Sequence, residues 1–208
     1  MLVAIAASAA ALVHQSLASS SSAHAPPVDI VRSASPSQAS SRPIWQGTSS
    51  GSPHRRGALG EADGAVPDGT TVFDDDVPAV VKLDPRLLAA LRRAATAAAA
   101  DGIVFVVDSG WRSPAYQERL LQDAVSKYGS EEEASRWVAK PTTSAHVSGD
   151  AVDVGHAASE WLSEHGAEYG LCRIYGNESW HYELRPEAIR RGCPPTYADP
   201  THDPRMWQ

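Results

Sequence analysis

The sequence predicts an α+β domain in which a small antiparallel sheet packs against several helices. Segments with helical spacing of apolar residues alternate with short β-branched runs after about residue 66. Capping residues and glycines mark the ends of the helical segments. Gly176-Asn177 predicts a hairpin turn between the last two strands. Helices that precede and interleave with a few strands are typical of the α+β class.

Three helices are expected in the first half of this domain. Asp84-Pro85 is an N-cap followed by proline, and Gly102 closes the helix that begins there. The expected apolar face of this helix is formed by Leu87, Leu88, Leu91, Ala95 and Ala98. Ser113-Pro114 begins a second helix that ends at Gly129, with Tyr116, Leu120, Ala124 and Tyr128 on one face. Ser130 to Glu133 is a capping box that opens a third helix through Val138.

The strands are predicted from shorter patterns. Residues 103–107 form a β-branched run that predicts a buried strand, and residues 151–154 predict another. Residues 141–149 between the helices and the second strand are expected to be a loop. Residues 171–175 and 178–184 flank the Gly-Asn turn as the arms of a hairpin. In that register Cys172 would lie opposite His181.

The N-terminal quarter differs from the rest in composition. Residues 1–18 are mostly Ala, Leu, Val and Ile, and Ala23-His24-Ala25 fits a small-x-small cleavage site, so residues 1–25 are expected to be a signal peptide. Cleavage after Ala18, an uncleaved membrane anchor and a cytoplasmic protein remain alternatives. Residues 26–65 are rich in Ser, Pro and Ala and predict a disordered linker, because they bury too little apolar surface to offset ordering entropy. Residues 66–208 are expected to form one globular domain.

The net charge of the chain argues against a nucleic-acid partner. The formal net charge of the chain is -7 at pH 7, whereas nucleic-acid binding requires clustered lysine and arginine. There is no Cys-x-x-Cys, which argues against a zinc ribbon or a thioredoxin-like redox pair.

Two histidines and an aspartate are candidate ligands for one metal ion. They are His146 and Asp153 in Ser-Ala-His-Val-Ser-Gly-Asp-Ala-Val-Asp, and His181 in Glu-Ser-Trp-His. Three such ligands leave the fourth zinc position open for water, which is typical of catalytic rather than structural sites. Glu178 is the carboxylate that could accept a proton from that water. The remaining histidines are interpreted as surface or linker residues: His14, His24, His54, His156, His165 and His202.

The spacing of Glu178 and His181 sets a geometric condition. Residues three apart on a regular strand point to opposite faces. Glu178 can therefore share a site with His181 only if it lies at the turn, where the pleat is interrupted.

The joint pattern resembles the VanY-type D-alanyl-D-alanine carboxypeptidases, which are zinc peptidases with the hedgehog/DD-peptidase fold. Ser-x-His-x-x-Gly-x-Ala-x-Asp is followed by Glu-x-Trp-His, and Ser-Gly-Trp-Arg-Ser with Gln117 resembles the family's Tyr-Arg-Ser segment. The resemblance extends from about Leu83 to Arg185. The one clear departure is Trp111, where the family usually has tyrosine.

The resemblance implies a role for each motif residue. It makes His146, Asp153 and His181 the ligands of one Zn²⁺ ion and Glu178 the general base. Arg112 would stabilise the negative charge that develops on the scissile carbonyl, although an arginine before a Ser-Pro cap could instead pair with a surface acid. The implied substrate-binding residues are Ser144, Gln117 and Trp180.

The two cysteines have two interpretations. In an oxidising compartment Cys172 and Cys193 are expected to form a disulfide. The alternative is that Cys172 binds zinc as a thiolate, because the predicted register places it near His181.

The predicted function is an exported D-alanyl-D-alanine carboxypeptidase that removes the terminal D-Ala from peptidoglycan stem peptides. We expect a monomeric, secreted or cell-wall-associated enzyme, with no nucleic-acid partner and with membrane association only through an uncleaved signal. The alternatives are an L,D-carboxypeptidase, a cross-link endopeptidase or a D-Ala-D-Ala dipeptidase on the same scaffold, and a non-catalytic zinc-containing wall-binding module.

Overall fold

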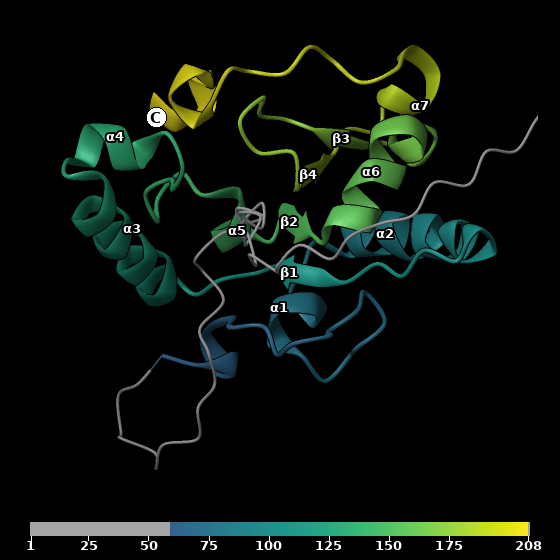
Figure 1. Ribbon diagram of the computed structural model, residues 1–208, viewed down its shortest axis with the longest axis horizontal. Coiled ribbons are helices and arrows are strands. Elements are labelled where there is room, and N and C mark those ends of the chain that lie inside the picture. The colour runs from purple at the N-terminus through teal and green to yellow at the C-terminus, as the bar shows by residue number, and fades with distance from the viewer. Residues whose placement is uncertain (1–58, 208) are drawn as a thin grey trace, which may run out of the picture. The chain divides into compact units, whose positions relative to one another are not determined.

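The computed structural model describes residues 59–207, which lie within one compact unit of the chain (Figure 1). The expected signal peptide and residues 26–58 of the expected linker lie outside the described residues. The α-helices are α1 (Pro78–Val81), α2 (Pro85–Ala98), α3 (Pro114–Tyr128), α4 (Glu131–Ser135), α5 (Ala145–Ser148), α6 (His156–His165) and α7 (Ala188–Arg191). The strands are β1 (Val107–Ser109), β2 (Ala151–Val154), β3 (Leu171–Arg173) and β4 (His181–Leu184). Short 3-10 helices are η1 (Glu61–Asp63), η2 (Ala99–Asp101), η3 (Gly166–Tyr169), η4 (Pro200–His202) and η5 (Pro204–Trp207).

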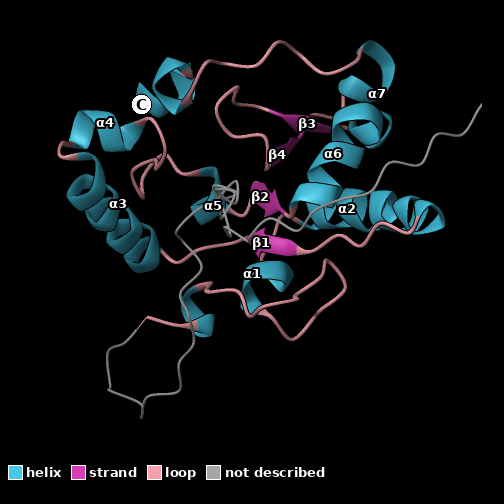
Figure 2. Cartoon of the chain, viewed as in Figure 1, coloured by secondary structure: helices cyan, strands magenta, loops and turns pink. Residues whose placement is uncertain are grey.

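The four strands form one antiparallel sheet in the order β1-β2-β4-β3. Figure 2 shows the strands between α3 and α4 on one side and α2 and α6 on the other. This arrangement confirms the predicted α+β class. In the central pair, β2 and β4, Asp153 lies directly opposite His181.

The main core lies between α2 and the sheet. The Asp84 side chain accepts hydrogen bonds from the backbone N–H groups of Arg86 and Leu87, which caps α2 as predicted. The helix buries Leu87 and Leu91 on the face that packs with residues of β2 and β4. This layer supports β2 and β4, the two strands that carry Asp153 and His181.

A second apolar cluster joins α3 to α4. Ser113 caps α3 at Tyr116 N, and Gly129 ends it at a φ of 85°, as the sequence predicted. Ser130 accepts a hydrogen bond from Glu133 N at 3.1 Å, so the third helix begins where expected. It ends at Ser135 rather than Val138. Ala124 and Val138 are nevertheless buried in the cluster that α3 and α4 share.

The strand predicted at residues 103–107 is wrong in its bounds, because β1 begins only at Val107. Val104 is 62% exposed, and Val106 forms only an isolated bridge with Thr71. The β-branched run is therefore the approach to the sheet, and pairing with β2 starts at its last residue.

The expected loop at residues 141–149 contains the short helix α5, so His146 comes from a helix. Gly149 ends this helix at a φ of 80°. A Cβ atom at Gly149 would lie 2.6 Å from the carbonyl oxygen of Lys82, so any larger residue would push α5 away from the start of α2. Gly149 thus allows the sharp change of direction between α5 and β2.

The predicted two-residue hairpin is also wrong. β3 ends at Arg173 and β4 begins at His181, and Cys172 pairs with Glu183 rather than His181. The Gly176-Asn177 pair is instead held by the C-terminal segment, because Gly176 N donates to Tyr197 O at 2.8 Å. A partner far along the chain therefore replaces the local turn.

The packed structure starts before the predicted boundary at Val66. Ser113 N donates to Asp63 O, and the Ser113 hydroxyl lies 3.1 Å from Asp63 Oδ1. A Cβ atom at Gly64 would lie 2.2 Å from Trp111 O, so η1 packs closely on the chain before α3. Residues 61–65 therefore belong to the domain rather than to the linker. None of the helices described between residues 59 and 207 has the length and hydropathy of a membrane span.

Candidate metal centre

The structure brings the three predicted metal ligands together. One ligand atom from each of His146, Asp153 and His181 lies within 4.8 Å of the others, and all three residues are buried. His146 Nε2 lies 3.4 Å and His181 Nδ1 lies 3.1 Å from the same oxygen, Asp153 Oδ1. The residues come from α5, β2 and the first position of β4. Two imidazoles and one carboxylate around one point form a donor set that suits Zn²⁺.

A backbone carbonyl fixes the ring of His146. Nδ1 lies 2.8 Å from Gly110 O, which makes Nδ1–H the donor and leaves the Nε2 lone pair directed at the site. Gly110 is itself confined, because a Cβ atom there would lie 2.0 Å from Ala79 O. The sequence motif around Arg112 thus contributes a backbone group as well as side chains.

His181 directs Nδ1 to the cluster, whereas His146 directs Nε2. Nδ1 faces Asp153, while Nε2 lies 3.3 Å from Glu183 Oε1. The ring of Tyr175 lies against the imidazole, with 5.2 Å between ring centroids. A carboxylate behind a ligating imidazole fixes its tautomer and orientation.

Arg112 is buried beside the cluster and is not a surface ion-pair residue. It is 8% exposed, and its Nη2 donates to Asp153 Oδ2 at 3.0 Å. Its Nε donates to Ser109 Oγ, and its Nη1 donates to Gln117 Oε1. Asp153 therefore directs one oxygen to the two histidines and the other to Arg112. The surface-acid alternative for Arg112 is excluded.

Glu178 lies in the connection before β4, where no regular pleat applies. Its Oε2 is 3.7 Å from His181 Nδ1, so the geometric condition stated above is met. The side chain is 6% exposed, and its Oε1 is buried without a hydrogen-bond partner among the described residues. Burial raises the pKa of Glu178 to about 7. A carboxyl group with such a pKa can exchange protons near neutral pH.

The charges of the cluster explain the other pKa shifts. Burial lowers the pKa of His181, but the hydrogen bonds to Asp153 and Glu183 outweigh this effect and raise it to about 10. Burial and the Arg112 charge lower the pKa of His146. Burial raises the pKa of Asp153, but its interactions with His146 and His181 hold it well below the usual value. A bound cation would take the place of the proton between Asp153 and His181.

The cluster opens into a pocket. Ser144 and Trp180 line it, and Gln117 forms part of its wall. Gln117 is 1% exposed and donates from Nε2 to Ala139 O at 2.8 Å while accepting from Arg112. The hydrogen bond from Arg112 to Gln117 thus holds Arg112 in place. Further lining residues are Leu120, Trp137, Val138, Ala139, Ala145, Tyr175, Pro200 and Met206.

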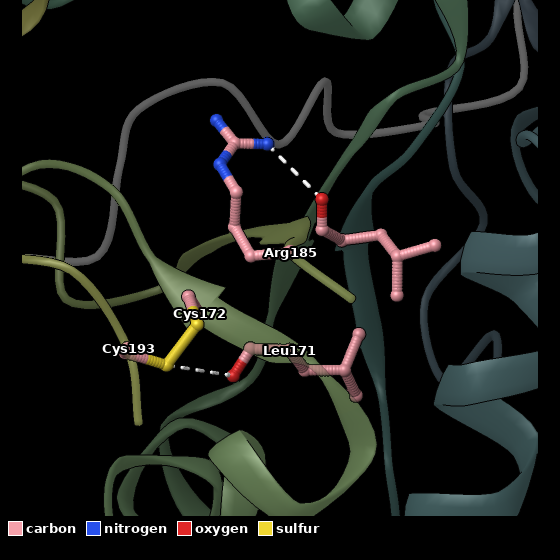
Figure 3. Close-up of a disulfide and its surroundings, with 5 residues drawn as sticks. Leu171, Cys172, Arg185 and Cys193 are labelled. Carbon is pink, nitrogen blue, oxygen red and sulfur yellow. Dashed lines mark hydrogen bonds between the residues drawn. A yellow bond between two sulfur atoms is a disulfide. The ribbon is translucent and has the colours of Figure 1, made fainter. Parts of the chain in front are cut away.

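The cysteines form the expected disulfide, which joins β3 to the segment after α7 (Figure 3). Cys172 is fully buried, and Cys193 Sγ lies 3.6 Å from Leu171 O. The alternative of a zinc thiolate at Cys172 is excluded because its sulfur is bonded to Cys193. His156, His165 and His202 lie on the surface or partly exposed, outside the cluster.

A family model described as VanY: D-alanyl-D-alanine carboxypeptidase matches residues 80–187, which contain the whole cluster. The chain belongs to the VanY family. A curated relative, a D-alanyl-D-alanine carboxypeptidase of Enterococcus faecalis, is 32% identical over 127 residues. The match covers 49% of this chain and 47% of the relative, so it spans about half of each protein.

Several solved structures are similar to this member of the VanY family. A mutant D,D-pentapeptidase VanY from a VanB-type resistance cassette, in complex with Zn(II), has a TM-score of 0.46 at 30% identity, covering 49% of this chain and 72% of that one. VanYB in complex with D-Alanine-D-Alanine has a TM-score of 0.48 at 29% identity, covering 53% and 74%. The LdcB LD-carboxypeptidase has a TM-score of 0.49 at 24% identity, covering 61% and 71%.

Sequence reasoning missed the residues that support the VanY-family cluster from behind. These are Gly110, Tyr175, Glu183 and Arg205. Glu183 follows His181 by two residues, so strand alternation could have placed both side chains on one face. No local pattern indicates Arg205, because its contact with Glu183 depends on how the C-terminal segment folds back.

Proposed function

We propose that this chain is a zinc-dependent D,D-carboxypeptidase that hydrolyses the terminal D-Ala from peptidoglycan stem peptides. The observation that carries the proposal is the convergence of His146, Asp153 and His181 with the buried carboxylate of Glu178 in one pocket. Membership of the VanY family supplies the substrate class. Because this substrate lies outside the cytoplasm, the proposed location is secreted or cell-wall associated.

The donor set fits a catalytic zinc ion. His146 would bind through Nε2, His181 through Nδ1 and Asp153 through Oδ1, because these atoms face one another. Three protein ligands leave a position free for water or substrate. Zinc in such a site acts as a Lewis acid and lowers the pKa of the water that it holds.

Glu178 is the proposed general base. Its pKa of about 7 allows it to take a proton from the attacking water and to return it to the departing D-Ala amine. Its Oε1, which has no hydrogen-bond partner among residues 59–207, can accept that proton. The nearby cation would favour the charged carboxylate, so the pKa would be lower in the zinc-loaded protein.

Arg112 is the proposed electrostatic partner of the oxyanion. Three of its contacts are to protein acceptors, and a guanidinium group carries five N–H donors. The remaining donors can serve the substrate, since Arg112 lines the pocket. A cation fixed beside the scissile carbonyl stabilises the developing charge without reorganisation. Ser144 and Trp180, which line the pocket, are proposed to contact the peptide, and Gln117 to hold Arg112.

The test is hydrolysis of defined muropeptides by the purified protein with one equivalent of zinc. Release of a single D-Ala from a muramyl pentapeptide, measured by mass spectrometry, is the expected result. Release from the tetrapeptide instead would identify an L,D-carboxypeptidase, and cleavage of cross-linked dimers would identify an endopeptidase. Glu178→Ala is the control, and it should bind zinc but release nothing. Zinc binding without turnover by the wild type would refute the proposal in favour of a wall-binding module.

A further inference from the structure

The C-terminal segment contacts the metal cluster from behind. The match to the VanY family ends at residue 187, whereas residues 203–205 reach two neighbours of His181. Residues 199–207 also lie near α4, where Arg136 Nε donates to Asp199 Oδ2 at 3.1 Å. Figure 1 shows the C-terminus beside α4. The segment is therefore packed on the domain through contacts at two places.

The first of these neighbours is Glu183. It is 1% exposed, and its Oε1 faces His181 Nε2 at 3.3 Å. Arg205 holds the carboxylate with both terminal nitrogens, from Nη1 to Oε2 at 2.7 Å and from Nη2 to Oε1 at 3.1 Å. Arg185 adds a contact to Oε2 at 2.7 Å. A carboxylate bound by two arginines cannot turn away from the imidazole without breaking charge-assisted hydrogen bonds.

The second neighbour is Tyr175. Its hydroxyl donates to Asp203 Oδ2 at 3.0 Å, and its ring packs against His181. Asp203 is fully buried and also accepts from Arg205 Nε at 3.0 Å. Asp203 and Arg205 therefore restrain both the hydrogen-bond partner and the packing partner of His181.

We propose that Arg205 and Glu183 are positioning residues that orient His181 so that its Nδ1 faces the metal. This inference rests on the proposed function, since it presupposes a metal between Asp153 and His181. An imidazole has two nitrogens, and a hydrogen bond at Nε2 determines which one is left for the ligand bond. Arg205 acts through Glu183 and does not reach the cluster itself. The C-terminal segment is thereby part of the metal centre, although it lies beyond the matched region.

The test compares three variants for zinc affinity, measured by chelator competition, and for the visible spectrum of the cobalt-substituted protein. Arg205→Met removes the charge and the hydrogen bonds but keeps the aliphatic stem. Glu183→Gln keeps the size of the side chain and removes its charge. Arg136→Met is the matched control, because it removes the other arginine contact of the C-terminal segment without touching Glu183. Each variant is first checked for a cooperative thermal transition in the zinc-free state.

Loss of such a supporting contact typically weakens metal affinity about 10- to 100-fold. We expect this loss in Arg205→Met, a smaller loss in Glu183→Gln and an altered cobalt spectrum in both. Arg136→Met should bind zinc as the wild type does. Should Arg205→Met not fold, Glu183→Gln decides alone.

Wild-type affinity and spectrum in the folded variants would overturn the positioning role. An equal loss in Arg136→Met would also overturn it, because general loosening of the segment would then explain the effect. A wild type that binds no zinc would overturn the metal centre and the positioning role together.

Discussion

Cutting the Cys172–Cys193 disulfide is expected to lower the free energy of unfolding by about 3 kcal/mol. The two cysteines are 21 residues apart in sequence. The chain-entropy relation gives about 11 cal/mol/K for a loop of this length, or about 3 kcal/mol at 25 °C. Domains unfold with an entropy of about 2 cal/mol/K per residue, so a domain of about 150 residues should melt about 10 °C lower.

Cys193→Ala is the best change for this measurement. Cys193 is exposed and Cys172 is fully buried, so truncation at Cys193 breaks the cross-link without opening a core cavity. Melting is followed by circular dichroism on the zinc-free protein, with and without a reductant. The reductant should lower the melting temperature of the wild type to that of the variant and leave the variant unchanged. A variant that melts within about 2 °C of the oxidised wild type would refute the loop-entropy reasoning.

Three further predictions concern the site and its supports. Glu178→Gln should lower kcat at least about 100-fold while zinc affinity by chelator competition stays within about threefold, and retained turnover would rule out Glu178 as the base. Gly110→Ala should cost about 1–3 kcal/mol of stability and weaken zinc binding, because its Cβ would displace the carbonyl that holds His146. Gly60→Ala is its control, since its Cβ would meet nothing within 4 Å, and equal melting temperatures for the two variants would contradict the overlap argument. Burial raises the pKa of Asp203, but hydrogen bonds from Arg205 outweigh it and lower the pKa below the usual value. The stabilisation by Asp203 is therefore present above its unfolded pKa of about 3.9 and is lost as the pH falls through the folded pKa. The melting temperature should decrease once the pH is lowered beyond about 4. An unchanged melting temperature at pH 3 would contradict this prediction.

The sequence predicts the parts of this fold that local signals determine. Asp84-Pro85 and Gly129 bound helices where capping chemistry requires them, and the metal-ligand pattern leads to residues that do converge. Prediction from the sequence fails where contacts with distant chain segments determine the local structure. Gly176-Asn177 looks like a tight turn, but backbone hydrogen bonds to Tyr197 and Ala198 hold it instead.

The same reason limits prediction of the site. The three metal ligands lie in short sequence motifs, because each motif sets the position of its ligand on α5, β2 or β4. These ligands are His146, Asp153 and His181. Arg205 lies in no motif, because its partner Glu183 is reached only after the C-terminal segment packs on the domain. Supporting residues of this kind become visible only in three dimensions.

The direct cross-strand pairing of Asp153 with His181 makes metal binding a check on how the sheet has assembled. A slip of one residue between β2 and β4 would send one of these side chains to the opposite face of the sheet. A slip of two residues would keep both on the same face but place them about 7–8 Å apart. Only the native alignment offers both ligands to one ion. Zinc would therefore select correctly registered molecules during folding, and misaligned chains would remain metal-free and inactive.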